Sequence, residues 1–189
     1  MSLEGEYVHL EPLRIAHSEE LRLIADMEYF QYFVTLGPHS LSPEDFALYI
    51  QSKIDEPNVL PFCVRLRAGR EAIGATSYMD IRAAHRGLEI GMTWIDRAHW
   101  GTKANPETKY LLLRHAFEEL KMVRVQLKTD ARNLHSQQAI AKLGARQEGT
   151  LRKHGIQRNG FIRDTVMFSI TDDDWPNVKQ ELLLRLESC

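Results

Sequence analysis

Alternating apolar and polar residues predict the strands of this chain. Side chains two positions apart lie on the same face of a strand, so each alternating run marks a strand with one buried face. The runs are residues 8–11, 62–66, 73–81, 88–94, 123–129, 145–151 and 161–170. This pattern predicts about seven strands.

Apolar residues that recur every three or four positions predict helices between these strands. Asn105 is a good N-cap, and Pro106 fits the first helical position after it. A short helix over 136–143 stops at Gly144. The five helices are expected to begin near Ser18, Ser42, Asn105, Ser136 and Asp174.

The order of these elements predicts a mixed α/β fold. An antiparallel meander comes first and β-α-β units follow, which implies a mixed sheet flanked by helices. No stretch between residues 1 and 189 resembles a linker, a low-complexity tract or an internal repeat. We therefore expect a single domain over residues 1–189.

Composition and charge narrow the class of protein. The net charge is −2, which does not suggest a nucleic-acid partner. No run approaches the roughly 18 apolar residues of a membrane span, and residues 1–6 lack the basic and apolar regions of a signal peptide. The two cysteines are Cys63 and the last residue, Cys189, and the histidines show no metal-ligand spacing. We expect a cytoplasmic protein that binds no metal and no membrane.

The segment from Trp94 to Asn105 is the first candidate binding site. A strand ends at Trp94 and Ile95, a loop with Gly101 follows, and a helix opens. The first N–H groups of a helix have no internal partner and carry the positive end of its dipole, so this junction suits a phosphate. An ordinary capped helix start is the alternative.

A second junction follows the next strand, where Asn133 and Ser136 open a short helix. Asn133 alone could simply cap that helix. The loops after neighbouring strands of a β-α-β unit emerge at the same edge of the sheet, where α/β proteins bind ligands. We therefore expect the two junctions to lie together.

Basic residues are concentrated between positions 142 and 163, against the single acid Glu148. They form either a solvated basic surface or a place for a phosphorylated ligand. The residues are Lys142, Arg146, Arg152, Lys153, Arg158 and Arg163.

The second junction also resembles a known family. The run Asn133-x-x-Ser136-x-x-x-Ile140-x-Lys142-Leu143-Gly144-Ala145, followed by Glu148-Gly149-x-Leu151-Arg152, is similar to the second cofactor motif of GNAT acetyltransferases. It most resembles the branch that contains the ribosomal-protein N-terminal acetyltransferases. Segments 10–13 and 163–169 resemble the opening and the penultimate strand of that branch, and the order of elements is the GNAT order.

The resemblance implies a splayed central sheet and acetyl-CoA as the acetyl donor. Pantetheine would enter between the strand ending at Trp94-Ile95 and the strand 123–129. The pyrophosphate would lie on backbone N–H groups of the first junction, and Lys142 or a nearby arginine would meet the 3′-phosphate. The cofactor-binding residues implied are Trp94, Ile95, Trp100, Gly101, Thr102, Lys103, Asn105, Asn133, Ser136 and Lys142.

The first junction departs from the family pattern, which is close to Gln-Gly-x-Gly-x-Ala. The matching residues are Trp100-Gly101-Thr102-Lys103-Ala104-Asn105, so Lys103 replaces a glycine that lets the backbone approach phosphate. Either the loop takes another path and Lys103 adds charge, or cofactor binding is weakened. The Asn105-Pro106 helix start favours a rebuilt loop that still binds.

Glu89 is the candidate general base. In GNAT enzymes a backbone N–H before the pyrophosphate loop polarises the thioester carbonyl, which here falls near Met92 to Trp94. Alternation puts Glu89 on the face opposite Leu88, Ile90 and Met92, where it could take a proton directly or through water. A solvent-facing or salt-bridged glutamate is the alternative. The general-acid tyrosine of many GNAT enzymes is Ile140 here, so Ser136 or an ordered water is the candidate donor.

The acceptor pocket is expected between residues 29–39 and 153–163. An aromatic cluster at Tyr29, Phe30, Tyr32 and Phe33 forms either core or pocket wall. The function implied is direct transfer of acetyl from acetyl-CoA, in a ternary complex, to a primary amine: a peptide or protein N-terminus, an amino acid or a small amine. The alternative is a non-catalytic GNAT-fold module that binds acetyl-CoA. Homodimers are common in this family.

Overall fold

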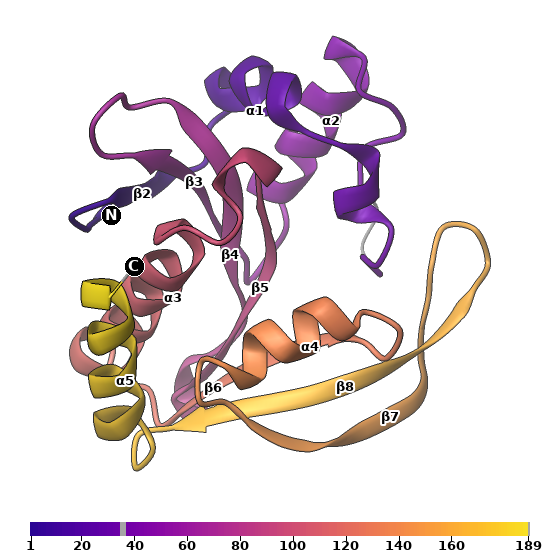
Figure 1. Ribbon diagram of the computed structural model, residues 1–189. Coiled ribbons are helices and arrows are strands. Elements are labelled where there is room, and N and C mark those ends of the chain that lie inside the picture. Colours follow the sequence, from indigo (N-terminus) through magenta and orange to yellow (C-terminus); the bar gives the residue numbers. More distant parts are fainter. Residues whose placement is uncertain (35–36, 189) are drawn as a thin grey trace.

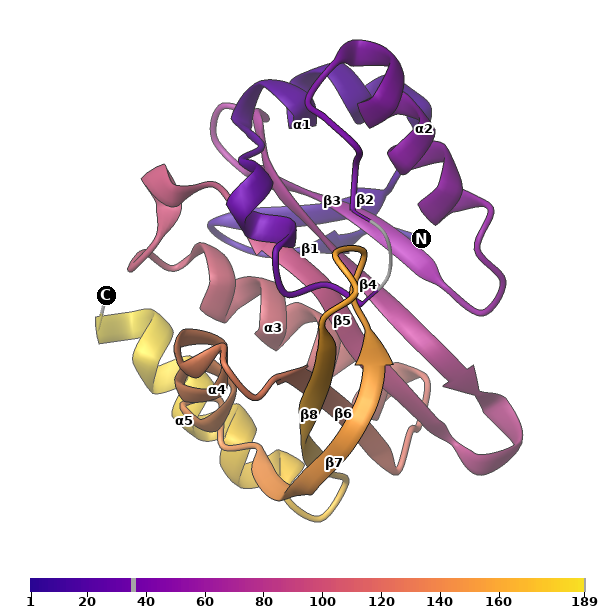
Figure 2. The same ribbon diagram turned by 90° about the vertical axis from the view of Figure 1, so that its right-hand side faces the viewer.

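The computed structural model describes residues 1–34 and 37–188. Within them, eight strands form one mixed sheet with helices on both faces (Figure 1 and Figure 2). The strands are β1 (Leu3–Glu4), β2 (Val8–Pro12), β3 (Leu60–Leu66), β4 (Ala72–Arg82), β5 (Gly87–Ile95), β6 (Arg124–Asp130), β7 (Arg146–Ile156) and β8 (Ile162–Thr171). The helices are α1 (Ser18–Ile24), α2 (Pro43–Ile54), α3 (Ala104–Arg114), α4 (Leu134–Ala141) and α5 (Trp175–Ser188).

The mixed α/β fold is confirmed, with one strand more than the seven that alternation predicts. The additional strand is β1, whose two residues are too few to show a period. The strand order is β1-β2-β3-β4-β5-β6-β8-β7, and only β5 and β6 pair in parallel among the described strands.

Two hydrophobic cores lie on opposite faces of the sheet. The larger is filled from α3 and α5, with Leu112 and Leu182 among its most buried members. The smaller is filled from α1 and α2, through residues such as Leu21 and Phe46. Helices cover both faces of the central strands, so consecutive residues are buried over Ala72–Tyr78 of β4 and Gly87–Ile90 of β5.

The sheet is splayed between β5 and β6, as expected. These two strands pair over three positions only, from Gly87–Arg124 to Glu89–Gln126. Beyond Glu89 the strands separate, whereas β6 pairs with β8 along its whole length of seven residues. The sheet therefore divides into a β1–β5 half and a β6–β8 half, with a gap that widens toward Ile95 and Asp130.

A bulge in β5 corrects the predicted alternation of residues 88–94. The ladder with β4 shifts between the Ala75–Trp94 and Ser77–Gly91 pairs, and Met92 has a left-handed backbone with φ of 49°. One additional residue in a strand exchanges its two faces. Trp94 consequently packs in the α1–α2 core, on the face opposite Leu88 and Ile90.

Both helices after the splayed strands begin earlier than predicted. Helix α3 begins at Ala104, and Thr102 Oγ1 accepts a hydrogen bond from Ala104 N at 3.2 Å. Asn105 is therefore the second helical residue and not the N-cap. Helix α4 begins at Leu134, two residues before the predicted start, because Asn133 caps it.

Candidate active site

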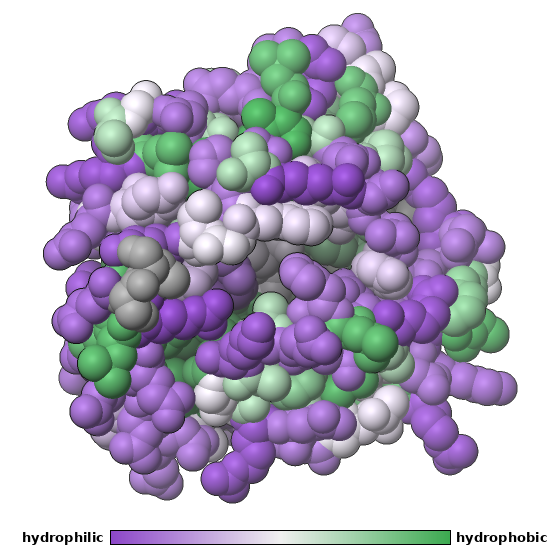
Figure 3. All heavy atoms as spheres, viewed as in Figure 1, coloured by the Kyte–Doolittle hydropathy of each residue, from purple (hydrophilic) through white to green (hydrophobic). Residues whose placement is uncertain are grey.

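The two helix starts that sequence analysis singles out lie together in the structure. The Trp100 ring stacks on the His135 ring with centroids 5.4 Å apart. The Trp100 indole also donates to the Ile95 carbonyl at 2.8 Å, which ties the loop back to the end of β5. Figure 3 shows a mainly hydrophilic face that is hollowed near its centre, over the region that separates α3 from α4 in Figure 1.

The loop before α3 accommodates Lys103 without backbone strain. Gly101 has a φ of 75°, the left-handed region that favours glycine, whereas Lys103 has φ −64° and ψ −15°, which any residue adopts. Ala104 N already donates to Thr102 and Pro106 has no N–H. The donors that remain in this first turn for an anion are therefore the N–H groups of Lys103 and Asn105.

Asn133 caps α4, as the simpler sequence interpretation states. Its Oδ1 accepts from Ser136 N at 3.0 Å, which places Ser136 in the first helical turn. Lys142 is exposed and lies just after the other end of α4, about 13.5 Å from Asn133 for nine residues at 1.5 Å each. The structure therefore brings Asn133 and Ser136 to the first junction but not Lys142.

Glu89 lies on the predicted face of β5 and is salt-bridged. Its carboxylate is 2.9 Å from Lys128 Nζ and accepts from Gln126 Nε2 at 3.0 Å. The side chain is only 2% exposed, so a solvent-facing glutamate is excluded. This polar group faces away from the α3 core, at the last position where β5 and β6 are still paired.

Lys109 is a buried amine that the sequence analysis did not single out. Its Nζ donates to Thr93 Oγ1 at 2.6 Å, and that hydroxyl is 2.8 Å from Thr76 Oγ1. Burial lowers the pKa of Lys109 to about 7. Thr76 and Thr93 lie where the bulge interrupts the β4–β5 ladder, and Lys109 contacts Thr93 from α3. A sequence signal existed, because Lys109 precedes Leu112 by three positions and so shares its buried helix face.

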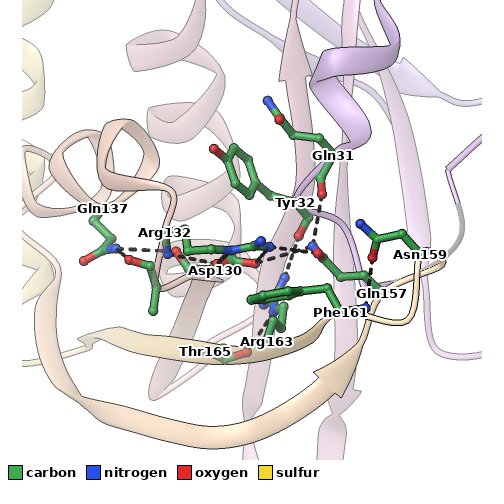
Figure 4. A network of polar contacts seen from close by, with 11 residues as sticks. Gln31, Tyr32, Asp130, Arg132, Gln137, Gln157, Asn159, Phe161, Arg163 and Thr165 are labelled. Carbon is green, nitrogen blue, oxygen red and sulfur yellow. Dashed lines mark hydrogen bonds and ion pairs between the residues drawn. The ribbon is translucent and has the colours of Figure 1, made fainter.

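The tip of the β7–β8 hairpin reaches the segment that follows α1, and both ribbon views agree on this (Figure 1 and Figure 2). Gln157 Nε2 donates to the Gln31 carbonyl at 3.0 Å, and Arg163 Nη1 donates to the Tyr32 carbonyl at 2.6 Å. Figure 4 shows Gln157 also bonded to Asp130 and Arg132, at the end of β6, while Arg163 contacts Tyr32 and Thr165. The two segments expected to build the acceptor pocket are therefore in contact.

The aromatic cluster divides between the two roles considered for it. Phe30 is buried in the α1–α2 core, and Tyr29 and Phe33 pack against that core. Tyr32 lies outside it, with the Arg132 guanidinium 5.7 Å from its ring centroid. Tyr32 is therefore the member of this cluster whose ring faces Arg132, in the loop after β6.

The described residues lack two further features. In residues 1–34 and 37–188, no group of three or more His, Cys, Asp or Glu side chains is arranged to hold a metal ion. No helix in the same ranges is long and apolar enough to cross a membrane.

Comparison with known proteins identifies the family. A model described as "Acetyltransferase (GNAT) domain" matches residues 8–146. The chain therefore belongs to the GNAT acetyltransferase family, and it is an acetyltransferase.

Its relatives agree with this class. "Probable N-acetyltransferase YjcK" of Bacillus subtilis (strain 168) is 27% identical over 184 residues, covering 91% of this chain and 98% of that protein. A crystal structure from T. thermophilus, described as a "putative acetyltransferase", is 38% identical with a TM-score of 0.91, covering 98% and 96%. Mycobacterium smegmatis RimJ in complex with CoA-disulfide has a TM-score of 0.80 at 20% identity, covering 98% and 94%. At that identity the likeness to RimJ is one of fold.

Proposed function

We propose that this acetyltransferase moves the acetyl group of acetyl-CoA directly to a primary amine in a ternary complex. The observation that carries the proposal is the separation of β5 from β6 after Glu89, with the starts of α3 and α4 meeting beside the gap. Two helix N-termini suit the phosphates of a nucleotide cofactor. The amine is a peptide or protein N-terminus, an amino acid or a small amine.

Acetyl-CoA would lie in the gap between the two halves of the sheet. The pantetheine arm would pair with the β5 main chain at Trp94 and Ile95, since the Trp94 side chain is buried in the core. The Thr108 hydroxyl, one turn after Ala104, is buried without a hydrogen-bond partner among the described residues, and an unmet buried hydroxyl is costly unless a ligand supplies a partner. The residues proposed to contact the cofactor are Trp94, Ile95, Trp100, Gly101, Thr102, Lys103, Asn105, Asn133 and Ser136, with Lys142 after the far end of α4 proposed for the 3′-phosphate.

Transfer forms a C–N bond between the amine and the acetyl carbonyl carbon and breaks the C–S bond to coenzyme A. Main-chain N–H groups at the bulge, between Met92 and Trp94, would stabilise the oxyanion. Glu89 lies three strand residues earlier, roughly 10 Å away at 3.4 Å per residue, so it would take the proton of the amine through water. The leaving thiolate would take a proton from Ser136 or from an ordered water.

The alternative is a GNAT-fold module that binds acetyl-CoA without transfer. The observation behind it is the pairing of Glu89 with Lys128, together with Ile140 at the position of the family's tyrosine. Lys128 Nζ already contacts a carboxylate oxygen of Glu89 that transfer would need as a proton acceptor. The two functions differ in thiol release and not in cofactor affinity.

Two measurements test this proposal. Saturating acetyl-CoA should raise the melting temperature of the chain, since a ligand that binds only the folded state stabilises it. Thiol release should then be followed over a panel of peptides with free N-termini, free amino acids and small amines. The absence of any thermal shift would contradict acetyl-CoA binding, and a shift without thiol release on any amine would support the non-catalytic module.

Compartment, domain count and oligomeric state stay predictions. Cys63 is buried, and burial raises the pKa of its thiol to about 12, which keeps it unreactive. An unreactive thiol fits the cytoplasmic location expected from the sequence. One domain over 1–189 and a homodimer can be tested by cooperative unfolding and by light scattering.

A further inference from the structure

An ion pair between the buried Asp130 and the exposed Arg132 marks the end of β6, outside the residues used in the proposed transfer. Asp130 is 1% exposed. Its carboxylate accepts two hydrogen bonds from Arg132, from Nε at 3.0 Å and from Nη2 at 2.7 Å. Burial alone would raise the pKa of Asp130, but the hydrogen bonds from Arg132 outweigh it and the pKa is lowered. A bidentate pair of this kind fixes the position of both side chains.

The pair extends to the hairpin tip. Arg132 Nη2 donates to Gln157 Oε1 at 2.8 Å, and its guanidinium lies 3.6 Å from the centroid of the Phe161 ring (Figure 4). Gln157 in turn donates to the Gln31 carbonyl at 3.0 Å. These contacts connect the end of β6 to the segment after α1, although residues 31 and 157 are 126 positions apart in sequence.

The same pair touches the cofactor side of the site. The Asp130 carbonyl accepts from Asn133 N at 2.9 Å, and Gln137 of α4 donates to the Ala131 carbonyl at 2.8 Å. The loop that positions the α4 N-terminus is thus held by the same two residues that hold the hairpin tip. Residues that fix one wall of a site relative to the other determine how well the reacting groups align.

We propose that Asp130 and Arg132 are positioning residues, which hold the acceptor side of the site, residues 27–34 and 153–163, in register with the α4 cofactor loop. This inference rests on the proposed function, because it assigns the amine to the hairpin side and acetyl-CoA to the α4 side. It predicts that loosening the pair weakens amine binding and leaves the affinity for acetyl-CoA nearly unchanged.

Asp130→Asn and Gln157→Met test the proposal. The first keeps the shape of the side chain and removes its charge. The second keeps the length of the side chain and removes its three hydrogen bonds, to Arg132, Gln31 and Asp130. Asp164→Asn is the matched control, because its carboxylate accepts from Lys153 N at 2.7 Å within the same hairpin. The readouts are KM for the fastest amine of the panel, the dissociation constant of acetyl-CoA from calorimetry, and amide hydrogen exchange of residues 27–34.

We expect the amine KM of both variants to rise at least about fivefold, while the acetyl-CoA dissociation constant stays within about twofold. Amide exchange of residues 27–34 should be at least about fivefold faster than in the parent and in Asp164→Asn. An unchanged amine KM, or a parallel rise of both constants, would overturn the inference. If Asp130→Asn does not fold, Gln157→Met still decides it, because that variant keeps the ion pair of Asp130 with Arg132.

The two proposals fail separately. A parent chain that releases no thiol refutes the transfer function, and amide exchange then tests the positioning contact without turnover. Unchanged exchange in that case overturns this inference as well, whereas an active parent with unchanged variants overturns this inference alone.

Discussion

The Trp100 ring lies on the His135 ring at an interplanar angle of 23°, and this contact joins the two loops that follow β5 and β6. The two strands have already separated when they reach these loops. The ring contact therefore spans the gap that the sheet leaves open. Arg97 adds a cation 5.6 Å from the centroid of the Trp100 ring.

Trp100 should report cofactor binding by fluorescence. It is 50% exposed, whereas Trp94 and Trp175 are buried, so a ligand at the junction changes the surroundings of Trp100 most. We expect acetyl-CoA to change the tryptophan emission and Trp100→Phe to remove most of that change. Trp175→Phe is the control, and a full signal in Trp100→Phe would place the cofactor elsewhere.

Glu89→Gln should lower kcat by about 10²- to 10⁴-fold, the usual contribution of a general base, with little change in KM for acetyl-CoA. The substitution keeps the shape of the side chain and removes its proton-accepting charge. Asp80→Asn is the matched control, because Asp80 accepts from the same Gln126 amide at 3.3 Å but is exposed. Full activity of Glu89→Gln across pH would refute its role as base.

Lys109 should make stability depend on pH. Its pKa is about 7 in the folded chain, against an ordinary value of 10.5. Between these values the unfolded chain binds more protons than the folded chain, so the free energy of unfolding rises with pH from about 7 to about 10.5 and is level below 7. Lys109→Met should abolish this rise.

Urea unfolding at about pH 7 and about pH 9.5 measures the effect, with Lys121→Met as the control because Lys121 is exposed. The same pH dependence in the parent and in Lys109→Met would show that folding does not lower the pKa of Lys109.

Asn133 can be tested for capping and for cofactor binding separately. Asn133→Ala should destabilise the chain by about 1 kcal/mol, because the N-cap acceptor of Ser136 N is lost. Asn133→Asp keeps the cap and adds a negative charge, so it should preserve the melting temperature and weaken acetyl-CoA binding. Unchanged affinity in Asn133→Asp would leave Asn133 a cap only.

Local sequence patterns predicted the helices and strands, whereas contacts between distant parts of the chain determine the arrangement of the site. Alternation found strands such as β6, in which every second residue is buried. It failed at Trp94 because one additional residue at Met92 exchanges the faces of β5, and no local signal marks that residue. The N-cap preference of asparagine misplaced the start of α3 at Asn105, because Thr102 supplies the acceptor there.

Only part of the candidate site could be predicted from the sequence, because its other contacts join residues far apart in the chain. Asn133 and Ser136 were recognisable from spacing within one short run. The contact of Asp130 with Gln157 joins residues 27 positions apart, and that of Gln157 with Gln31 spans 126. Such pairings depend on where the hairpin tip docks, which the periodicity of either segment does not encode.

Glu107 on α3 holds the amino-terminal segment. Its carboxylate accepts the main-chain N–H groups of Glu6, Tyr7 and Val8 at 2.9, 2.8 and 2.6 Å, and it is 6% exposed.

This attachment bears on how the protein can be handled. An affinity tag or surface linkage fused before Met1 leaves the three amides in place, whereas trimming the chain to begin at residue 9 removes all three donors. The trimmed protein would keep an uncompensated charge inside the helix that begins at the cofactor loop. Loss of cofactor affinity after proteolytic clipping at the amino end would then report damage to a helix whose Glu107 lies 99 to 101 positions away in sequence.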